Sequence, residues 1–345
     1  MRIAIVNDLA LARVVLRRVV ESVPGYEVVW EATDGAQAIQ KATVQKPDAI
    51  LMDLVMPGID GAVATRQIMS KSPCPILVVT SSVGANHGKV YEALGAGGLD
   101  AVRTPTLGPG GSVKGAEPLL ACLAKLGRMT QREPMLTRLV PPPAGHRVRP
   151  ARSAIPLLAI GASTGGPDAV ARVLAHLGSD APTAVVVIQH IAGDYTAGFA
   201  EWLTRQSGWK ARVPTTGDRP QIGWVAIAGG DDHLILDADG GFRFTPDPVA
   251  YPYRPSVDVF FSSAAASGYS GVAVLLTGMG SDGARGLADL RTAGWHTIAQ
   301  NQSSSVVYGM PKAAVESNAA MDVLPLDQIG GTIRRLLAGM SQSRS

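Results

Sequence analysis

Apolar and polar positions alternate with two different periods along the first 128 residues. Apolar runs of four to seven residues are each followed by a longer segment with apolar residues at helical spacing. This pattern predicts five strand and helix pairs, and hence a doubly wound α/β domain with a five-stranded parallel sheet. The strands are expected at Arg2–Val6, Tyr26–Ala32, Ala49–Met52, Ile76–Thr80 and Leu99–Val102, and the helices at Ala10–Ser22, Gly35–Val44, Gly61–Ser70, Lys89–Ala96 and Glu117–Leu126.

The same two periods return in the second half of the chain. The runs Ile155–Ile160, Ala184–Ile188 and Gly271–Leu276 predict buried strands, and Asp168–Leu177 has the apolar spacing of a helix. We therefore predict a second doubly wound α/β domain, with a mostly parallel sheet, over residues 154–345.

The segment between the two domains, residues 129–153, has neither period. It contains five prolines, and the run Pro141–Pro143 favours an extended backbone over packed structure. Its five arginines against one acid give it a charge of 5 − 1 = +4. We predict a linker here.

The positive charge of the linker changes how the net charge of the whole chain is interpreted. The chain of 345 residues has a net charge of +3, so the two domains together carry 3 − 4 = −1. A DNA-binding regulator would carry a basic recognition helix after the linker, and no such segment occurs, so we expect no nucleic-acid partner. Cys74 and Cys122 have no metal-type spacing, and no apolar run is long enough for a membrane span, so we expect a cytoplasmic protein.

Polar residues end several strands of the first domain: Asn7, Asp8, Asp53, Thr80 and Thr104. The carboxyl ends of parallel strands share one sheet edge, where ligands bind. Asp8 and Asp53 are suitable ligands for Mg²⁺, and the Thr80 hydroxyl can hydrogen-bond a phosphoryl group. Each acid taken alone is also an ordinary turn residue.

The segment Asp53–Gly61, DLVMPGIDG, resembles the centre of the receiver domain of bacterial response regulators. The resemblance implies a flavodoxin-like fold, Asp53 as phospho-acceptor and Mg²⁺ for phosphorylation. Two positions depart from the family pattern: Asn7 replaces one acid of a pair, and Thr104 stands where the family has lysine. Strand alternation directs the neighbouring Arg103 the other way, so it does not replace that lysine.

In the second domain, a predicted strand is followed by GASTGGP, Gly161–Pro167, and then by a helix. This arrangement fits a nucleophile elbow with Ser163 at its apex. Two alternatives remain open from the motif alone: a phosphate-binding turn, although Ser163 replaces the middle glycine such turns use, and a turn that only packs.

A general base and an orienting acid follow other strands. His190 comes after Ala184–Ile188 and Asp282 comes after Gly271–Leu276, so both are expected near Ser163. Together they predict an acyl-transfer triad in which Ser163 attacks, His190 takes its proton and Asp282 fixes the imidazole. The chain order Ser, His, Asp differs from that of α/β-hydrolases, which indicates a separate fold.

Five motifs, GASTGGP, VVIQHI, YRPSVDVFF, LLTGMGSDGA and QNQSSSVVYGMPKAA, together resemble the catalytic domain of CheB-type protein-glutamate methylesterases. The resemblance implies that Ser163, His190 and Asp282 form the triad, that Thr164 and Met279 lie at the oxyanion, and that the esterase needs no cofactor. The segments VNDLALA and DAVRTPTLG resemble the Wsp-type surface-sensing subgroup.

That family hydrolyses glutamate γ-methyl esters on methyl-accepting chemoreceptors and can also deamidate glutamine. The resemblance further implies that a CheA-type histidine kinase phosphorylates the receiver and that the unphosphorylated receiver covers the esterase cleft. A catalytically silent adaptor is the alternative, although all three triad positions are present.

Two further clusters have competing interpretations. Arg254, in a proline-stiffened segment, is either a contact for the acidic substrate or an exposed residue of a rigid loop. The trio Asp231-Asp232-His233 has metal-ligand chemistry, but adjacent residues rarely converge on one ion, and we expect it to be structural.

Overall fold

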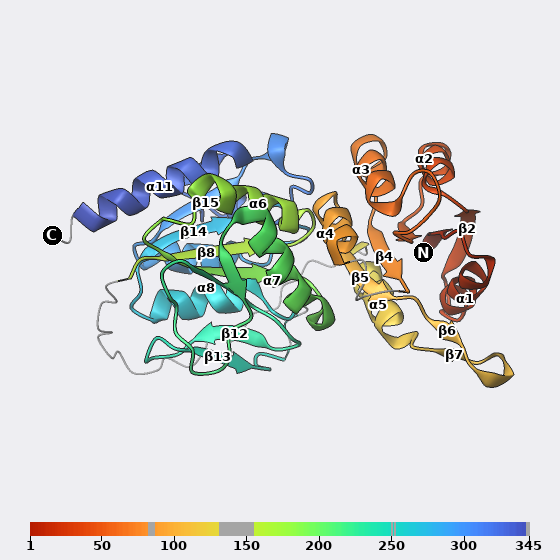
Figure 1. Cartoon of the computed structure of the whole chain (residues 1–345), viewed down its shortest axis with the longest axis horizontal. Coiled ribbons are helices and arrows are strands. Elements are labelled where there is room, and N and C mark those ends of the chain that lie inside the picture. The colour runs from red at the N-terminus through yellow and green to blue at the C-terminus, as the bar shows by residue number, and fades with distance from the viewer. Residues whose placement is uncertain (82–86, 131–154, 250, 252, 343–345) are drawn as a thin grey trace.

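The computed structural model describes residues 1–81, 87–130, 155–249, 251 and 253–342. It has two lobes, with the N-terminal domain and the C-terminal domain side by side (Figure 1). The predicted linker, residues 129–153, lies almost entirely outside the described residues. Its first two residues are helical, because α5 (Glu117–Thr130) continues four residues beyond the predicted helix end at Leu126.

The N-terminal domain is the predicted five-stranded parallel sheet, with strand order β2-β1-β3-β4-β5. Before α5, its elements are β1 (Arg2–Val6), α1 (Ala10–Glu21), β2 (Glu27–Ala32), α2 (Gly35–Val44), β3 (Ala49–Met52), α3 (Gly61–Lys71), β4 (Ile76–Thr80), α4 (His87–Gly95) and β5 (Asp100–Arg103). The sequence pattern did not predict the antiparallel hairpin of β6 (Thr106–Leu107) and β7 (Val113–Lys114), because two-residue strands are too short to show alternation.

The C-terminal domain has a seven-stranded sheet in the order β10-β11-β9-β8-β14-β15-β16, and every pairing in it is parallel. Its strands are β8 (Leu157–Ala162), β9 (Ala184–Gln189), β10 (Lys210–Arg212), β11 (Trp224–Ile227), β14 (Gly271–Leu275), β15 (His296–Gln300) and β16 (Asp322–Leu324), and a separate hairpin pairs β12 (His233–Leu236) with β13 (Phe242–Thr245). Its helices are α6 (Gly166–Leu177), α7 (Gly193–Ser207), α8 (Val257–Ala266), α9 (Ala284–Thr292), α10 (Met310–Glu316) and α11 (Leu326–Gln342). The doubly wound fold is thus confirmed in both domains.

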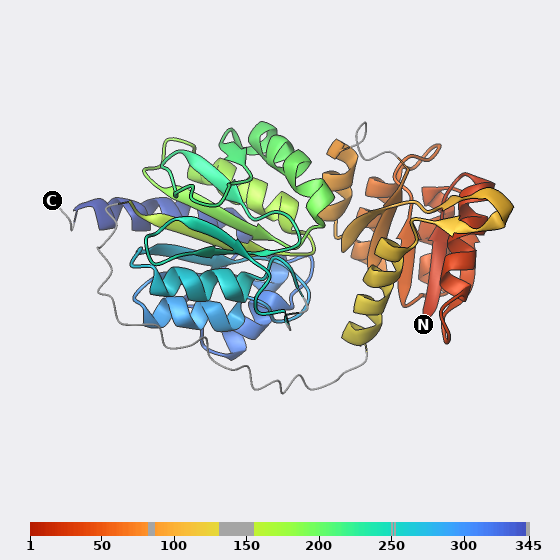
Figure 2. The same cartoon turned by 90° about the horizontal axis from the view of Figure 1, so that it is seen from below.

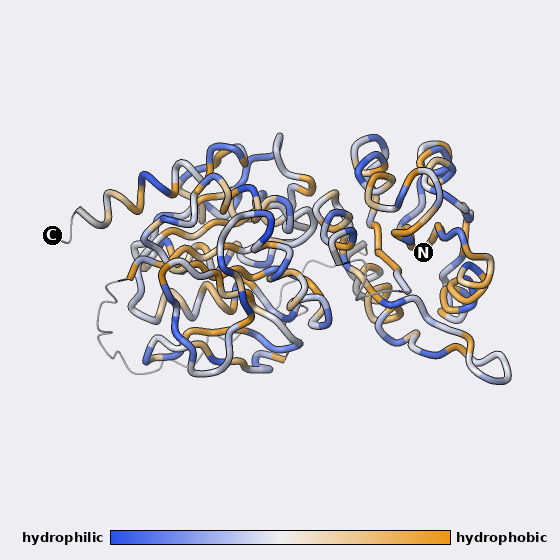
Figure 3. Tube along the Cα trace, in the orientation of Figure 1, coloured by the Kyte–Doolittle hydropathy of each residue, from blue (hydrophilic) through white to orange (hydrophobic). Residues whose placement is uncertain are grey.

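Helices cover both faces of the seven-stranded sheet (Figure 2). Alternate residues of β8 separate the two cores: Leu158 and Ile160 pack with α6, α7 and α11, whereas Leu157 and Ala159 pack with α8, α9 and α10. Figure 3 shows the apolar strand positions running through the middle of each lobe. Such near-continuous apolar strands are typical of parallel sheets buried on both faces.

The two domains share one apolar core through α4. Its Val90, Tyr91 and Leu94 are buried in the same cluster as residues of α6 and α7. At the C-terminal end of α4, the Gly165 amide donates to the Leu94 carbonyl over 3.1 Å. A Cβ at Gly95 would lie only 2.9 Å from the Asp168 Cβ, so this close approach requires glycine.

Across the part of the chain that the structure describes, no helix combines the length and the apolar character needed to cross a bilayer.

Candidate active site

Three neighbouring strands bring Ser163, His190 and Asp282 together. Ser163 directly follows β8, His190 directly follows β9, and Asp282 lies in the loop after β14. The strand order turns at β8 and β14, which is where ligands bind in open α/β sheets. The three residues are almost buried, with exposed fractions of 6%, 8% and 6%.

Ser163 lies in a tight turn between β8 and α6. Its amide donates to the Thr277 carbonyl over 3.1 Å, and its carbonyl accepts from the Gly166 amide over 2.8 Å and from Gln189 Nε2 over 2.9 Å. Gly165 has a φ of +78° and precedes the first turn of α6. This left-handed position favours glycine, which explains why a turn so tight can present Ser163 at a helix N-terminus.

The imidazole of His190 is fixed at one nitrogen. Its Nε2 lies 2.8 Å from Asp282 Oδ2, whereas its Nδ1 is buried and has no hydrogen-bond partner within the described residues. A proton on Nε2 is donated to the carboxylate and leaves the Nδ1 lone pair free to act as a base. His190 and Ser163 line one pocket, so Nδ1 is the nitrogen available to the serine hydroxyl.

The N-terminus of α8 holds the Asp282 carboxylate. It accepts hydrogen bonds from Ser256 Oγ over 2.8 Å, from the Val257 amide over 2.8 Å and from the Asp258 amide over 3.0 Å. Burial acts to raise the pKa of Asp282, but the hydrogen bond and charge of His190 and these amides outweigh it and lower the pKa. Asp282 therefore stays ionised and keeps its orienting role over a wide pH range.

A second carboxyl group, Asp258, is buried beside Asp282. Burial and the charge of Asp282 raise the pKa of Asp258 to about 7, although the Gly286 amide donates to its Oδ1 over 2.8 Å. Because this pKa lies above the value near 4 of an unfolded aspartate, the folded state binds the proton more tightly. The resulting stability is complete below about pH 4 and is lost as the pH rises through 7.

We expect Asp258→Asn to remove most of this pH dependence. The amide cannot ionise, so between pH 4 and pH 7 the variant should gain a few kcal/mol of unfolding free energy relative to the parent chain. Melting of the C-terminal domain across this range measures the effect. Asp239→Asn, at an exposed position, is the matched control, and an Asp258→Asn profile parallel to that of the parent would contradict the prediction.

The two residues expected at the oxyanion lie next to Ser163. Met279 lines the same pocket as Ser163, and the Thr164 carbonyl accepts from Thr277 Oγ1 over 2.9 Å. The Thr164 hydroxyl is buried without a hydrogen-bond partner among the described residues. Their role at the oxyanion stays a prediction.

His233 contacts Ser256, the residue that hydrogen-bonds the Asp282 carboxylate. It is fully buried, and its Nδ1 accepts from the Ser256 amide over 3.1 Å. Burial lowers the pKa of His233, which keeps Nδ1 unprotonated and able to accept. No group of three metal-ligating side chains occurs among the described residues. The structural interpretation of the trio Asp231-Asp232-His233 stays a prediction.

The sequence analysis missed the part played by Ser256. A serine before an apolar helical run, with an acid two residues later, is a helix N-cap signal, and Ser256 does cap α8. Arg254, two residues earlier, lines a second pocket that shares His190 and Tyr253 with the pocket over Ser163, and its guanidinium donates to the Val249 carbonyl over 3.0 Å. Its contact with substrate stays a prediction.

The receiver pocket has Asp53 at its centre, directly after β3. Asp53 Oδ1 accepts from the Leu54 amide over 2.7 Å, and Oδ2 accepts from Asn7 Nδ2 over 3.0 Å. Burial raises the pKa of Asp53 to about 6 against two backbone hydrogen bonds, and the nearby Asp8 charge adds to the rise. Asn7 thus donates a hydrogen bond to the Asp53 carboxylate, whereas an acid at position 7 would repel that carboxylate.

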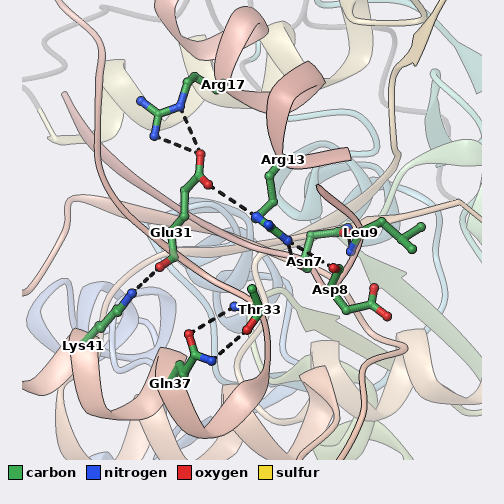
Figure 4. A network of polar contacts seen from close by, with 9 residues as sticks. All are labelled: Asn7, Asp8, Leu9, Arg13, Arg17, Glu31, Thr33, Gln37 and Lys41. Carbon is green, nitrogen blue, oxygen red and sulfur yellow. Dashed lines mark hydrogen bonds and ion pairs between the residues drawn. The ribbon is translucent and has the colours of Figure 1, made fainter. Parts of the chain in front are cut away.

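A polar network fixes the Asn7–Leu9 turn (Figure 4). Arg13 donates to the carbonyl oxygens of Asn7 and Asp8 over 2.8 and 3.1 Å and pairs with Glu31 over 3.3 Å. The Leu9 amide donates to Asn7 Oδ1 over 2.9 Å. This bracing holds the Asp8 and Asn7 side chains at the end of β1.

The remaining receiver candidates lie at the ends of β4 and β5, the two strands on one side of β3. Thr80, at the end of β4, is buried, and its carbonyl accepts from the Thr104 amide over 3.0 Å. Arg103 is exposed and acts on the other domain: burial raises the pKa of Tyr195 to about 12, and the Arg103 charge opposes that rise. That Arg103 does not replace the missing lysine stays a prediction.

The receiver forms one wall of the pocket over Ser163. Leu99, Asp100 and Cys122 of the receiver line it together with residues of the C-terminal domain. The N-terminal domain therefore covers one side of the active site in this structure.

Comparison with known proteins identifies the family of both domains. Residues 158–333 match the family model "CheB methylesterase", and residues 3–106 match "Response regulator receiver domain". The chain is 49% identical over its full length to a Burkholderia thailandensis protein, of which it also covers 100%, named protein-glutamate methylesterase/protein-glutamine glutaminase 4. It is 50% identical to a Burkholderia orbicola protein named protein-glutamate methylesterase/protein-glutamine glutaminase 3, with 95% of this chain and 96% of the relative covered.

A solved structure agrees as well. The crystal structure of the Thermotoga maritima CheB methylesterase catalytic domain is 33% identical, with a TM-score of 0.50, and the match covers 53% of this chain and 100% of that one. The chain therefore belongs to the CheB methylesterase family and carries a response regulator receiver domain ahead of its catalytic domain.

Proposed function

We propose that this protein hydrolyses glutamate γ-methyl esters on methyl-accepting chemoreceptors and releases methanol. The observation that carries the proposal is the buried Asp282–His190 pair: His190 lines the same pocket as Ser163, and its Nδ1 has no hydrogen-bond partner among the described residues. The chain shares about half of its residues with proteins named for this activity. Methanol release from methylated receptor membranes, measured with the phosphorylated chain, tests the proposal directly.

The chemistry follows from the roles of the three residues. Ser163 Oγ attacks the ester carbonyl while its proton passes to His190 Nδ1, and the imidazolium that forms is stabilised by Asp282 through Nε2. The same proton then leaves with methanol. Water then attacks the acyl-enzyme carbonyl and passes a proton to His190 Nδ1. The imidazolium returns this proton to Ser163 Oγ as the bond between Oγ and the carbonyl carbon breaks, and the glutamic acid that is released loses its own proton to solvent.

The same acyl-enzyme can form from a glutamine amide, with ammonia as the leaving group. Relatives of this chain are named glutaminases as well as methylesterases, so we include protein-glutamine deamidation in the proposed function. Arg254, in the second pocket beside His190, is the cation proposed to face the acidic side chains of the receptor.

For the N-terminal domain we propose that a CheA-type histidine kinase of a chemotaxis or Wsp-type pathway phosphorylates Asp53. Burial and, to a smaller extent, the Asp8 charge raise the pKa of Asp53, so the two carboxylates repel each other, and a cation would relieve this repulsion. Mg²⁺ needs only one or two carboxylates besides waters and a phosphoryl group. Asp8 and Asp53 fit that requirement and would hold the ion, whose charge would neutralise the incoming phosphoryl group.

Asn7→Asp is expected to strengthen Mg²⁺ binding several-fold. The substitution adds a carboxylate at the turn that Arg13 braces and removes the Asn7 donor from Asp53. Calorimetric titration of the full chain with Mg²⁺ measures the effect, and Asp53→Asn is the control that should weaken binding. Equal affinity in Asn7→Asp and the parent chain would exclude Asn7 as the residue that limits metal binding.

We propose a cytoplasmic location, where such a kinase has access to the receiver. Neither Cys74 nor Cys122 forms a disulfide in this structure, and burial raises the pKa of the Cys74 thiol to about 11, which suits a thiol that stays reduced.

A further inference from the structure

The ring of Tyr253 lies flat against the imidazole of His190. The ring centroids are 4.4 Å apart, and the two planes differ by 1°. Tyr253 belongs to the segment that leads into α8, three residues before the Ser256 cap. The segment that holds Asp282 therefore also supplies a flat surface for the histidine that Asp282 orients.

The Tyr253 ring is itself enclosed. A Cβ placed on Gly280 would lie 3.0 Å from the Tyr253 hydroxyl oxygen, so the turn after Met279 lies directly against the phenol. Burial, with the charge of Asp282, raises the pKa of Tyr253 to about 12. The phenol therefore remains neutral at working pH and presents an electron-rich face to the imidazole.

The hydrogen bonds of the triad do not by themselves fix the orientation of the His190 ring. The hydrogen bond at Nε2 is the single one that the described residues make to the His190 imidazole. One hydrogen bond leaves the ring free to rotate about that contact, whereas general-base catalysis needs Nδ1 aimed at Ser163. A stacked neighbour removes this freedom because it fixes the plane of the ring.

The stacked ring also stabilises the positive charge that His190 gains during the reaction. During acyl transfer His190 becomes a cation, and a cation over the face of an aromatic ring is stabilised by the ring's quadrupole. This stabilisation is present in the transition state and absent in the resting enzyme, so it contributes to kcat.

We propose that Tyr253 is a positioning residue for the triad: it holds the His190 ring with Nδ1 toward Ser163 and stabilises the imidazolium. The proposal rests on the function proposed above. It differs from a substrate-contact role, which its place in the pocket lining would also permit.

Two substitutions in the full chain separate these roles. Tyr253→Phe keeps the aromatic face, and Tyr253→Leu removes it while keeping an apolar side chain. With phosphodonor present, Tyr253→Phe should keep the parent kcat for methanol release, and Tyr253→Leu should lose about tenfold in kcat with KM nearly unchanged. The acid limb of the pH profile should also move to lower pH in Tyr253→Leu, because its imidazolium is less stable. A raised KM with unchanged kcat, or equal losses in both variants, overturns the proposal.

A measurement without turnover keeps the test independent of the proposed reaction. The pKa of His190 is measured by NMR titration in the Ser163→Ala chain, with the resonance assigned by its loss in His190→Gln. The proposal expects a lower pKa with Leu at position 253 than with Phe or Tyr, and equal values in all three overturn it. If the His190 pKa is lower with Leu at position 253, as expected, but the parent chain releases no methanol, the methylesterase function is rejected while the role of the stack remains supported.

Discussion

Ser163→Ala is expected to abolish methanol release from methylated receptor. The variant loses the oxygen that forms the acyl-enzyme, so His190 and Asp282 no longer have the serine hydroxyl to activate. Triad members act as a unit, so the loss in kcat should be about 10⁴-fold or more, with KM changed little. Both methanol and ammonia release should disappear together, because both reactions pass through the same serine ester.

The control for this variant is Ser281→Ala. Ser281 is exposed in the loop that carries Asp282, and its hydroxyl has no part in the proposed chemistry. Ser281→Ala should retain the parent rate, and Ser163→Ala should show the parent's melting temperature. Methanol release by a folded Ser163→Ala chain at a rate near that of the parent would exclude the triad as the catalytic centre.

The parallel topology explains why the triad could be located from sequence. Ser163 and His190 are the first residues after β8 and β9, so an apolar run and the polar residue at its end were enough to place them. Asp282 lies seven residues beyond Leu275, and only its position in a glycine-rich loop after the strand indicated it. The receiver residues Asp8, Asp53 and Thr80 were found in the same way.

The residues that sequence reasoning missed are brought in by packing between distant elements. Nothing near Tyr253 in the sequence indicates that its ring lies on His190, 63 residues earlier, because the stack depends on the path of the segment before α8. The burial of Asp258 beside Asp282 could not be predicted from the sequence either, because the two residues are 24 positions apart. Strand periodicity predicts where an element ends, but it does not predict which loops fold over that end.

The contact between the domains is a further case of long-range packing. The sequence alone indicates only that Tyr91 is one of the apolar positions of a predicted receiver helix. In the structure its ring lies 5.7 Å from those of Phe199 and Trp202 on α7, and its hydroxyl donates to the Tyr195 carbonyl over 2.6 Å. These contacts join α4 to the helix that follows His190, so the receiver is held where it covers one side of the pocket.

Tyr91→Ala is expected to raise the activity of the unphosphorylated chain by one to two orders of magnitude. Truncation of a buried aromatic side chain costs about 3–5 kcal/mol in total, and we expect about 1.4–2.8 kcal/mol of this to be lost from the interface, where each 1.4 kcal/mol shifts the population of the open form about tenfold. Tyr91 packs on the C-terminal domain, so the receiver fold should survive its loss. The initial rate of methanol release without phosphodonor measures the effect, and a chain lacking residues 1–128 gives the upper limit.

Two controls make this test specific to the α4–α7 contact. Tyr91→Phe keeps the ring and loses only the hydrogen bond to Tyr195, so its basal rate should rise much less. Val44→Ala removes an apolar side chain that is 83% exposed at the end of α2 and should change nothing. If Tyr91→Ala accepts phosphate at Asp53 normally yet keeps the low basal rate, the covered pocket is not maintained by this contact. If the truncated chain is less active than the full chain, the receiver does not inhibit by covering the site at all, because its removal would then expose Ser163 without benefit to the reaction.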